Sequence, residues 1–269
     1  QHQGESRDRA LVEATVGGSL AAVLAPVALG VAERTQAGWR AGLLLPLLAL
    51  AVIYFAFRRL DLPAGAAASA GTRRRLPAAF WPAAVLVSVV VGIEFCLVFY
   101  APQLLRAGAG VSTSQAATVL SLFYVGELAG RTAGAGLTRG AGRARSLTVI
   151  GLAVTATGVL ALWLSGHAWP AIFGLLIAGL GVANLYPLTL AMALGSAAGH
   201  TDLANSRVQL LTGIAVLSGP LLLGFLADRI GVTRAFSLVV VLITVALILV
   251  VVRSPAASRP AGVSPEQFR

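Results

Sequence analysis

The sequence has few charges and lacks several residue types that catalytic and metal sites use. Charged residues make up 11% of its 269 residues, Lys is absent, and there are one cysteine, one methionine and three histidines. Without Lys the chain cannot form the lysine-containing phosphate loop of the common nucleoside triphosphatases. Its single cysteine, Cys96, cannot form an internal disulfide, and its histidines lie far apart in loops. We therefore expect no catalytic residues, no metal and no other cofactor.

Long apolar runs make up most of what is present. Hydrophobic residues are 57% of the sequence and the mean hydropathy is +0.86, which is too high for a soluble core covered by polar surface. A membrane-spanning helix needs about 20 apolar residues. Eight such blocks lie at 11–32, 39–58, 80–105, 113–138, 145–165, 168–196, 203–228 and 234–252. Continuous blocks, unlike the alternating pattern of barrel strands, predict an all-α polytopic membrane protein with eight transmembrane helices.

The basic residues are all arginine, and their positions indicate how the chain crosses the membrane. If every block spans, 15 of the 20 arginines fall on the side that holds both ends, and five fall on the other side. Arginine collects in cytoplasmic loops. We therefore expect a multi-pass protein with both ends of this chain in the cytoplasm. We assign it to a bacterial plasma membrane. The net charge of +10 then needs no nucleic-acid partner.

Two polar segments divide the chain into parts. Residues 59–79 hold an Ala/Ser run and three consecutive arginines, and we interpret them as a solvated cytoplasmic linker; a lipid-binding or regulatory role is the alternative. Residues 253–269 are rich in Pro, Ser and Ala and predict a disordered cytoplasmic tail. Two apolar blocks lie in 1–58, before the linker, and six lie in 80–252, after it.

One pattern occurs twice, which indicates an internal repeat. The first copy consists of Ala25-Pro26, Leu29-Gly30, Glu33-Arg34 and Arg40-Ala41. The second copy consists of Gly219-Pro220, Leu223-Gly224, Asp228-Arg229 and Arg234-Ala235. The run from Gly219 to Gly231 resembles the end of the eleventh helix of the major facilitator superfamily. Gly38-Trp39-Arg40 is similar to the start of its sixth helix, and the run from Gly179 to Pro187 resembles its tenth.

The resemblance covers nearly the whole chain and implies a twelve-helix secondary transporter made of two six-helix halves. Residues 1–58 would then hold the last two helices of the N-terminal half, and residues 80–252 the complete C-terminal six-helix bundle. The chain begins at Gln1 and its only methionine is Met192, so we interpret it as a piece that lacks four upstream helices. The implied partners are those helices, the lipid bilayer and a small-molecule solute. We expect a monomer.

One loop departs from the family. The family motif after the eighth helix reads roughly G-x-L-a-D-R-x-G-R-R, and the matching stretch from Ala135 to Arg143 carries Arg139 at the acid position. The resemblance therefore implies a basic cytoplasmic anchor at this loop. The resemblance does not imply the charged interactions that the acidic residue of this motif usually forms.

Three ionisable residues lie well inside apolar blocks, away from the block ends, where each costs about 2.5–3.5 kcal/mol and is a candidate functional group. Glu127 and Arg131 lie four residues apart and therefore share one helix face. They form either a structural pair or a switch that protonation of Glu127 opens. Glu94 has no partner on its own helix. Proton coupling, a hydrogen bond to a polar neighbour and solute binding all remain open for it.

Uncharged polar residues inside the blocks are candidates for lining a solute cavity. Asn205, Gln209 and Thr212 follow each other at i, i+4 and i+7 and predict a polar stripe. Hydrogen bonding between helices is the alternative, and Asn205 is also a candidate helix cap. Further cavity candidates are Tyr124, on the same stripe as Glu127, together with Asn184 and Tyr186 in the glycine-rich block.

Glycine and proline inside the blocks predict kinks or gating elements, because they interrupt helices and free backbone groups. The candidates are Gly179, Gly181, Pro187, Gly219 and Pro220. A kink that contacts no ligand is the alternative. Gly126, Gly130 and Gly134 recur every four residues, which predicts close helix packing.

These features favour a transporter that moves a small solute by alternating access, coupled to protons through Glu94 or Glu127. One alternative is a truncated remnant or scaffold that transports nothing. Another is a membrane-embedded lipid-modifying enzyme, which the absence of His and Asp clusters in the loops disfavours.

Overall fold

The computed structural model describes residues 24, 25, 27, 29, 31, 40, 44–58, 75–137 and 143–252. Within these ranges the regular structure is helical throughout, which confirms the predicted all-α class. Four of the predicted features lie wholly or mostly outside the described residues. They are the first apolar block, most of the linker, the loop with Arg139 and the C-terminal tail.

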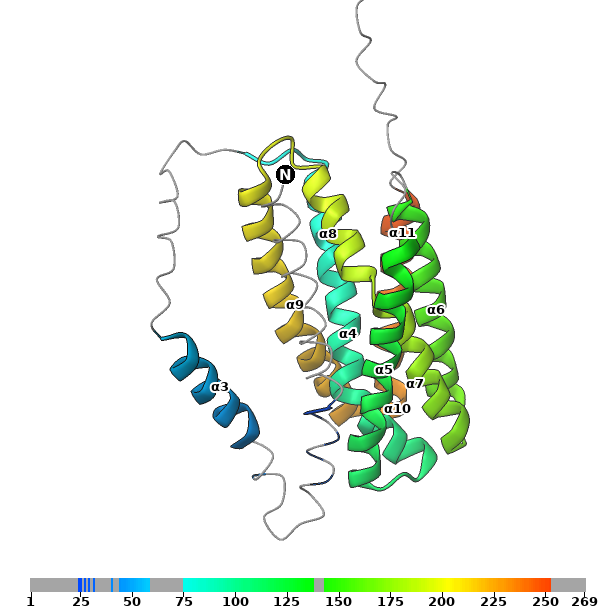
Figure 1. The fold of residues 1–269 in the computed structure, drawn as a ribbon. Helices are drawn as coiled ribbons and strands as arrows, with labels where there is room; N and C mark the ends of the chain where they lie inside the picture. Colours follow the sequence, from blue (N-terminus) through cyan, green and yellow to red (C-terminus); the bar gives the residue numbers. More distant parts are fainter. Residues whose placement is uncertain are drawn as a thin grey trace, which may run out of the picture.

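The described helices are α3 (Leu44–Phe57), α4 (Phe80–Ala109), α5 (Thr113–Leu137), α6 (Ala144–Leu164), α7 (Ala168–Val182), α8 (Leu185–Gly195), α9 (Thr201–Ile230), α10 (Val232–Ala235) and α11 (Ser237–Val252). Two apolar segments are interrupted: α7 and α8 meet at Ala183-Asn184, and α10 and α11 meet at Phe236. The six blocks predicted after residue 80 thus correspond to α4, α5, α6, α7–α8, α9 and α10–α11 (Figure 1).

Five described segments are long and apolar enough to cross a membrane: Phe80–Gly108, Ala144–Leu164, Ala168–Gly195, Thr201–Ile230 and Val232–Val252. The remaining block of the six, α5, has the length at 25 residues but a lower hydropathy. It contains Glu127 and Arg131 and many Ser, Thr and Gly residues, which account for the difference. Helix α3 lies apart from the bundle in Figure 1, and its described side chains are all exposed.

Helix α4 is the centre of the bundle. It packs against every helix from α5 to α11, and its side chains Leu86, Ile93 and Leu97 are fully buried. Helices α5 and α9 flank it without sharing a packing interface with each other. Between these two helices α4 presents a stripe of exposed residues that includes Trp81, Phe99 and Gln103, which we call the open face.

Glycines allow α7 to pack directly on the backbones of α5 and α6. A Cβ atom on Gly179 would overlap the backbone carbonyl of Phe123 in α5, and one on Gly181 would overlap Thr155 in α6. Gly126 and Gly130 stand equally close to the backbone of α7. The close packing predicted from the glycines of α5 is therefore confirmed.

Helix α6 is tied to the last helix pair at both of its ends. The indole Nε1 of Trp163 donates a hydrogen bond of 2.6 Å to the carbonyl of Thr233 in α10. At the other end Nη2 of Arg145 donates to the carbonyl of Val251 in α11, also at 2.6 Å. The second bond satisfies a carbonyl in the last turn of α11, which has no partner within its own helix.

Candidate functional site

Two carboxylates lie at similar depth on neighbouring helices. Glu94 comes fourteen residues after the start of α4, and Glu127 comes fourteen residues after the start of α5. At 1.5 Å per residue, each lies about 21 Å along its helix. If each helix starts at a membrane surface, this distance puts both carboxylates near the middle of a bilayer that is about 40–45 Å thick with its headgroups.

Glu127 and Arg131 form an ion pair across one turn of α5. The Glu127 side chain is 7% exposed, whereas the Arg131 side chain is 36% exposed. The carboxylate is therefore held inside the bundle, and the guanidinium extends from it toward the surface. A buried carboxylate is tolerated here because its counter-charge is on the same helix.

Arg131 also contacts the break between α7 and α8. Its Nε donates to the carbonyl of Ala183 at 3.4 Å. In an uninterrupted helix that carbonyl would accept from the residue four positions later, which is Pro187 and has no N–H. The proline thus frees a carbonyl at membrane depth, and the arginine satisfies it.

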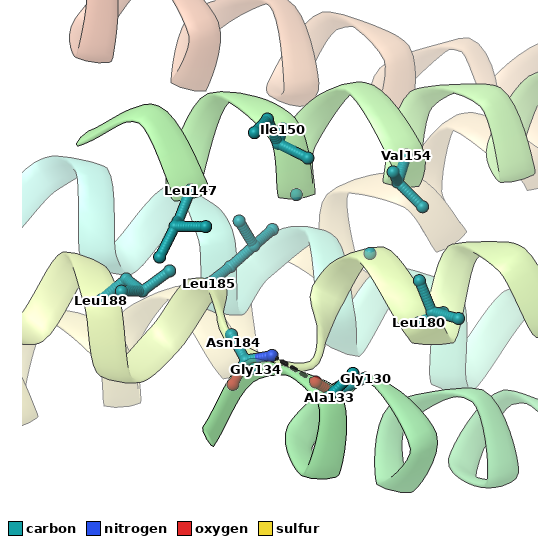
Figure 2. A pocket seen from close by; sticks show the side chains of 12 residues that line it. Gly130, Ala133, Gly134, Leu147, Ile150, Val154, Leu180, Asn184, Leu185 and Leu188 are labelled. Atoms are coloured by element: carbon teal, nitrogen blue, oxygen red, sulfur yellow. Dashed lines mark hydrogen bonds between the residues drawn. The ribbon is translucent and has the colours of Figure 1, made fainter. Parts of the chain in front are cut away.

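A second hydrogen bond joins α5 to the same break. The amide Nδ2 of Asn184 donates to the carbonyl of Gly130 at 2.6 Å, as Figure 2 shows. The Asn184 side chain occupies the space that a Cβ atom on Gly134 would need. Glycine at that position is therefore a condition for this contact.

Glu94 and Tyr124 complete what we call the charge cluster: Glu94, Tyr124, Glu127 and Arg131. Glu94 lies within electrostatic range of both Glu127 and Arg131, and Tyr124 within range of both carboxylates. Glu94 is partly buried and makes no hydrogen bond or ion pair with the described residues. The cluster therefore contains one carboxylate paired on its own helix and one that is not paired.

The polar stripe of α9 lies elsewhere. Asn205 and Gln209 are exposed, while Thr212 is buried and lies 3.4 Å from Oε1 of Gln209. The three residues share a face as the spacing predicts. However, α9 packs on the other flank of α4 from α5, so the structure does not bring this stripe to the charge cluster.

The remaining candidates have separate surroundings. Tyr186 packs against an apolar cluster at the ends of α4, α8 and α9 that includes Phe80 and Val208. Helix α9 continues through Pro220, and a Cβ atom on Gly219 would come within 3.3 Å of the sulfur of Cys96. Pro220 lines a cavity of about 270 Å³ between α4 and α9, beside Phe99, Tyr100 and Gln103.

Two features were not identified in the sequence analysis. One is the backbone carbonyl of Ala183 at the helix break, which accepts a hydrogen bond from Arg131. The other is the α4 side of the cavity beside Pro220. Pro187 was a usable signal for the first, because it removes the donor to the carbonyl of Ala183. No comparable signal marks Phe99 or Gln103, which lie in a long apolar block. Among the described residues no group of three or more His, Cys, Asp or Glu side chains is placed to hold a metal ion.

The sequence model described as Major Facilitator Superfamily matches residues 83–268, which is more than half of the chain. This chain belongs to the major facilitator superfamily. The resemblance inferred from the glycine and proline motifs is thereby confirmed. The members of this superfamily are multi-pass membrane transporters of small solutes and not enzymes, so the lipid-modifying enzyme is excluded.

An uncharacterized MFS-type transporter of Yersinia pestis is 28% identical to the chain over 134 residues. The match covers 50% of this chain and 35% of that relative. The chain thus aligns with about a third of the length of a curated superfamily member.

Proposed function

We propose that this superfamily chain transports a small solute by alternating access and couples that movement to protons through Glu94 and Glu127. The charge cluster carries the proposal. It contains two carboxylates within electrostatic range of each other and of Arg131, at a depth that we assign to the membrane middle, where ionisable groups are costly and usually functional. Protonation of Glu127 would release Arg131 from its ion pair, and this change reaches the α7–α8 break through the carbonyl of Ala183.

The open face of α4 and the cavity beside Pro220 are where we place the solute. In this arrangement helices α4 to α11 are the C-terminal half of a twelve-helix transporter, and α3 belongs to the N-terminal half. The solute passes between the halves near the midplane, and they rock around it. We further propose that the protein works as a monomer in the plasma membrane, with the ends of this chain in the cytoplasm.

The experiment uses the full-length gene product in vesicles that contain a pH-sensitive dye. A panel of sugars, amino acids, organic cations and organic anions is added under an imposed pH gradient. We expect at least one solute class to drive proton movement, and Glu94→Gln or Glu127→Gln to abolish that movement. Each variant is also tested for solute exchange without a gradient, which separates lost coupling from lost folding.

The matched control is Asp202→Asn, which neutralises an exposed acid in the first turn of α9. It should leave coupled flux unchanged. If the double variant Glu94→Gln, Glu127→Gln retains solute-driven proton movement, proton coupling through this cluster is wrong.

A further inference from the structure

A groove of about 130 Å³ lies beside the α7–α8 break, next to the hydrogen bond between Asn184 and Gly130. Helices α5 and α6 form its two walls, each packing more closely on α7 than on the other, and α7 and α8 form its floor. Figure 2 shows Leu147, Ile150 and Val154 of α6 facing this space. Ile150 is 57% exposed, so the groove opens outward, toward the lipid.

The groove is apolar along its length. Its lining consists of Leu, Ile, Val, Ala and Gly residues and one polar side chain, Asn184, whose amide already donates to Gly130. From Leu147 to Val154 it extends about 10 Å at 1.5 Å per residue. That is shorter than one leaflet of a hydrocarbon core of about 30 Å. A hydrocarbon chain from the surrounding leaflet fits these dimensions and this chemistry.

An exposed arginine stands at the mouth of the groove. Arg143 precedes α6 with helical backbone angles, and its carbonyl accepts from the N–H of Leu147. The two residues are therefore one turn, or about 5.4 Å, apart on the same face. The Arg143 side chain makes no capping bond to α6. A basic group next to an apolar groove at a helix end is suited to a phospholipid phosphate.

We propose that this groove is a binding site for one phospholipid, with an acyl chain between α5 and α6 and the phosphate at Arg143. The site shares no lining residue with the cavity beside Pro220, where we place the solute. The bound chain fills the gap between α5 and α6 and packs against the α7–α8 break. This lipid is therefore part of the folded bundle and not one of the exchanging lipids around it.

The test uses purified full-length protein in detergent with phosphatidylglycerol, followed by native mass spectrometry. We expect one lipid to be retained. Ala133→Phe, which fills the groove, should abolish retention, and Arg143→Gln should weaken it about fivefold. A phosphatidylglycerol with a diazirine in its acyl chain should crosslink to peptides from residues 144–154 or 180–188. Inorganic phosphate should not displace the lipid.

The controls make the same changes away from the groove. Ala153→Phe lies on an exposed side of α6, and Arg207→Gln lies in α9, which starts at the same end of the bundle. Both should retain the lipid, and thermal unfolding checks that each variant is folded. Equal retention in groove and control variants would overturn the proposal. Crosslinks confined to other segments would do so too, as expected if another helix fills the groove.

Discussion

Pro187 acts on a neighbouring helix through the carbonyl that it leaves free. Because proline has no N–H, the carbonyl of Ala183 lacks its usual helical donor. Ala183 lies at a helix break, where an unsatisfied carbonyl in the membrane would cost several kcal/mol. Arg131 donates to that carbonyl while it holds Glu127 in an ion pair. One side chain thus contacts both the charged centre of α5 and the interruption in its neighbour.

Replacing Pro187 should therefore alter the break. Pro187→Ala restores an N–H donor to Ala183, so we expect slower amide hydrogen exchange at residues 183–188 and slower solute exchange. Hydrogen–deuterium exchange with mass spectrometry measures the first effect. Pro170→Ala is the control, because Pro170 lies in the first turn of α7, where no helical acceptor is lost. Unchanged or faster exchange at 183–188 would contradict this account.

The ion pair of α5 should show energetic coupling. Glu127→Ala or Arg131→Ala alone should each lower the free energy of unfolding by about 2 kcal/mol. This is below the 3–5 kcal/mol of fully buried pairs, because Arg131 is partly exposed. The double variant should cost less than the sum of the two single changes. Unfolding in mixed micelles measures all three proteins, and additive effects would show that the pair contributes nothing.

At the scale of elements, α7 depends on glycine where it meets its neighbours. A side chain at Gly179 or Gly181 would push two backbones apart, whereas Gly92 and Gly213 have room for one. The interface therefore has little capacity to adapt by moving side chains. It differs in this respect from the contact between α4 and α9, where side chains such as Leu223 fill the space.

A matched pair of substitutions tests this difference. Gly179→Ala places a methyl group against the carbonyl of Phe123 and should lower stability by about 1–3 kcal/mol. Gly213→Ala, in the interior of α9, meets no atom within 4 Å and should raise stability by up to about 1 kcal/mol. Thermal unfolding in detergent compares them. Equal midpoints for the two variants would contradict backbone-to-backbone packing at Gly179.

Helix positions were largely predictable from the sequence, because runs of apolar residues report burial in lipid directly. The block predicted at 145–165 is the helix Ala144–Leu164, and the one at 203–228 lies within Thr201–Ile230. The partner of Asn184 was not predictable. A hydrogen bond from Asn184 to Gly130 depends on how two helices are rotated about their axes, and a single sequence does not contain that rotation. The pairing of Glu127 with Arg131 was predictable because it needs one helix only.

For the whole molecule, the alternation of helices predicts which loops face outward. Cys96 is the one cysteine in the sequence and it is buried, so a cysteine introduced into a loop would be the thiol that a reagent reaches. Gly166→Cys, between α6 and α7, should react with a membrane-impermeant maleimide in intact cells. Thr201→Cys, at the start of α9, should react only after the cells are opened. The reverse labelling pattern would invert the proposed orientation.

The central place of α4 also has a consequence for biosynthesis. Of the six bundle segments it is made first, yet it packs against α9 and α11, which are made last. Contacts between segments so far apart in sequence form slowly. Until α5 has been inserted, Glu94 would lie in the bilayer without Arg131 nearby. We therefore expect early insertion of this chain to depend on the cell's membrane insertion machinery. That machinery would keep α4 out of contact with lipid until the last helix leaves the ribosome.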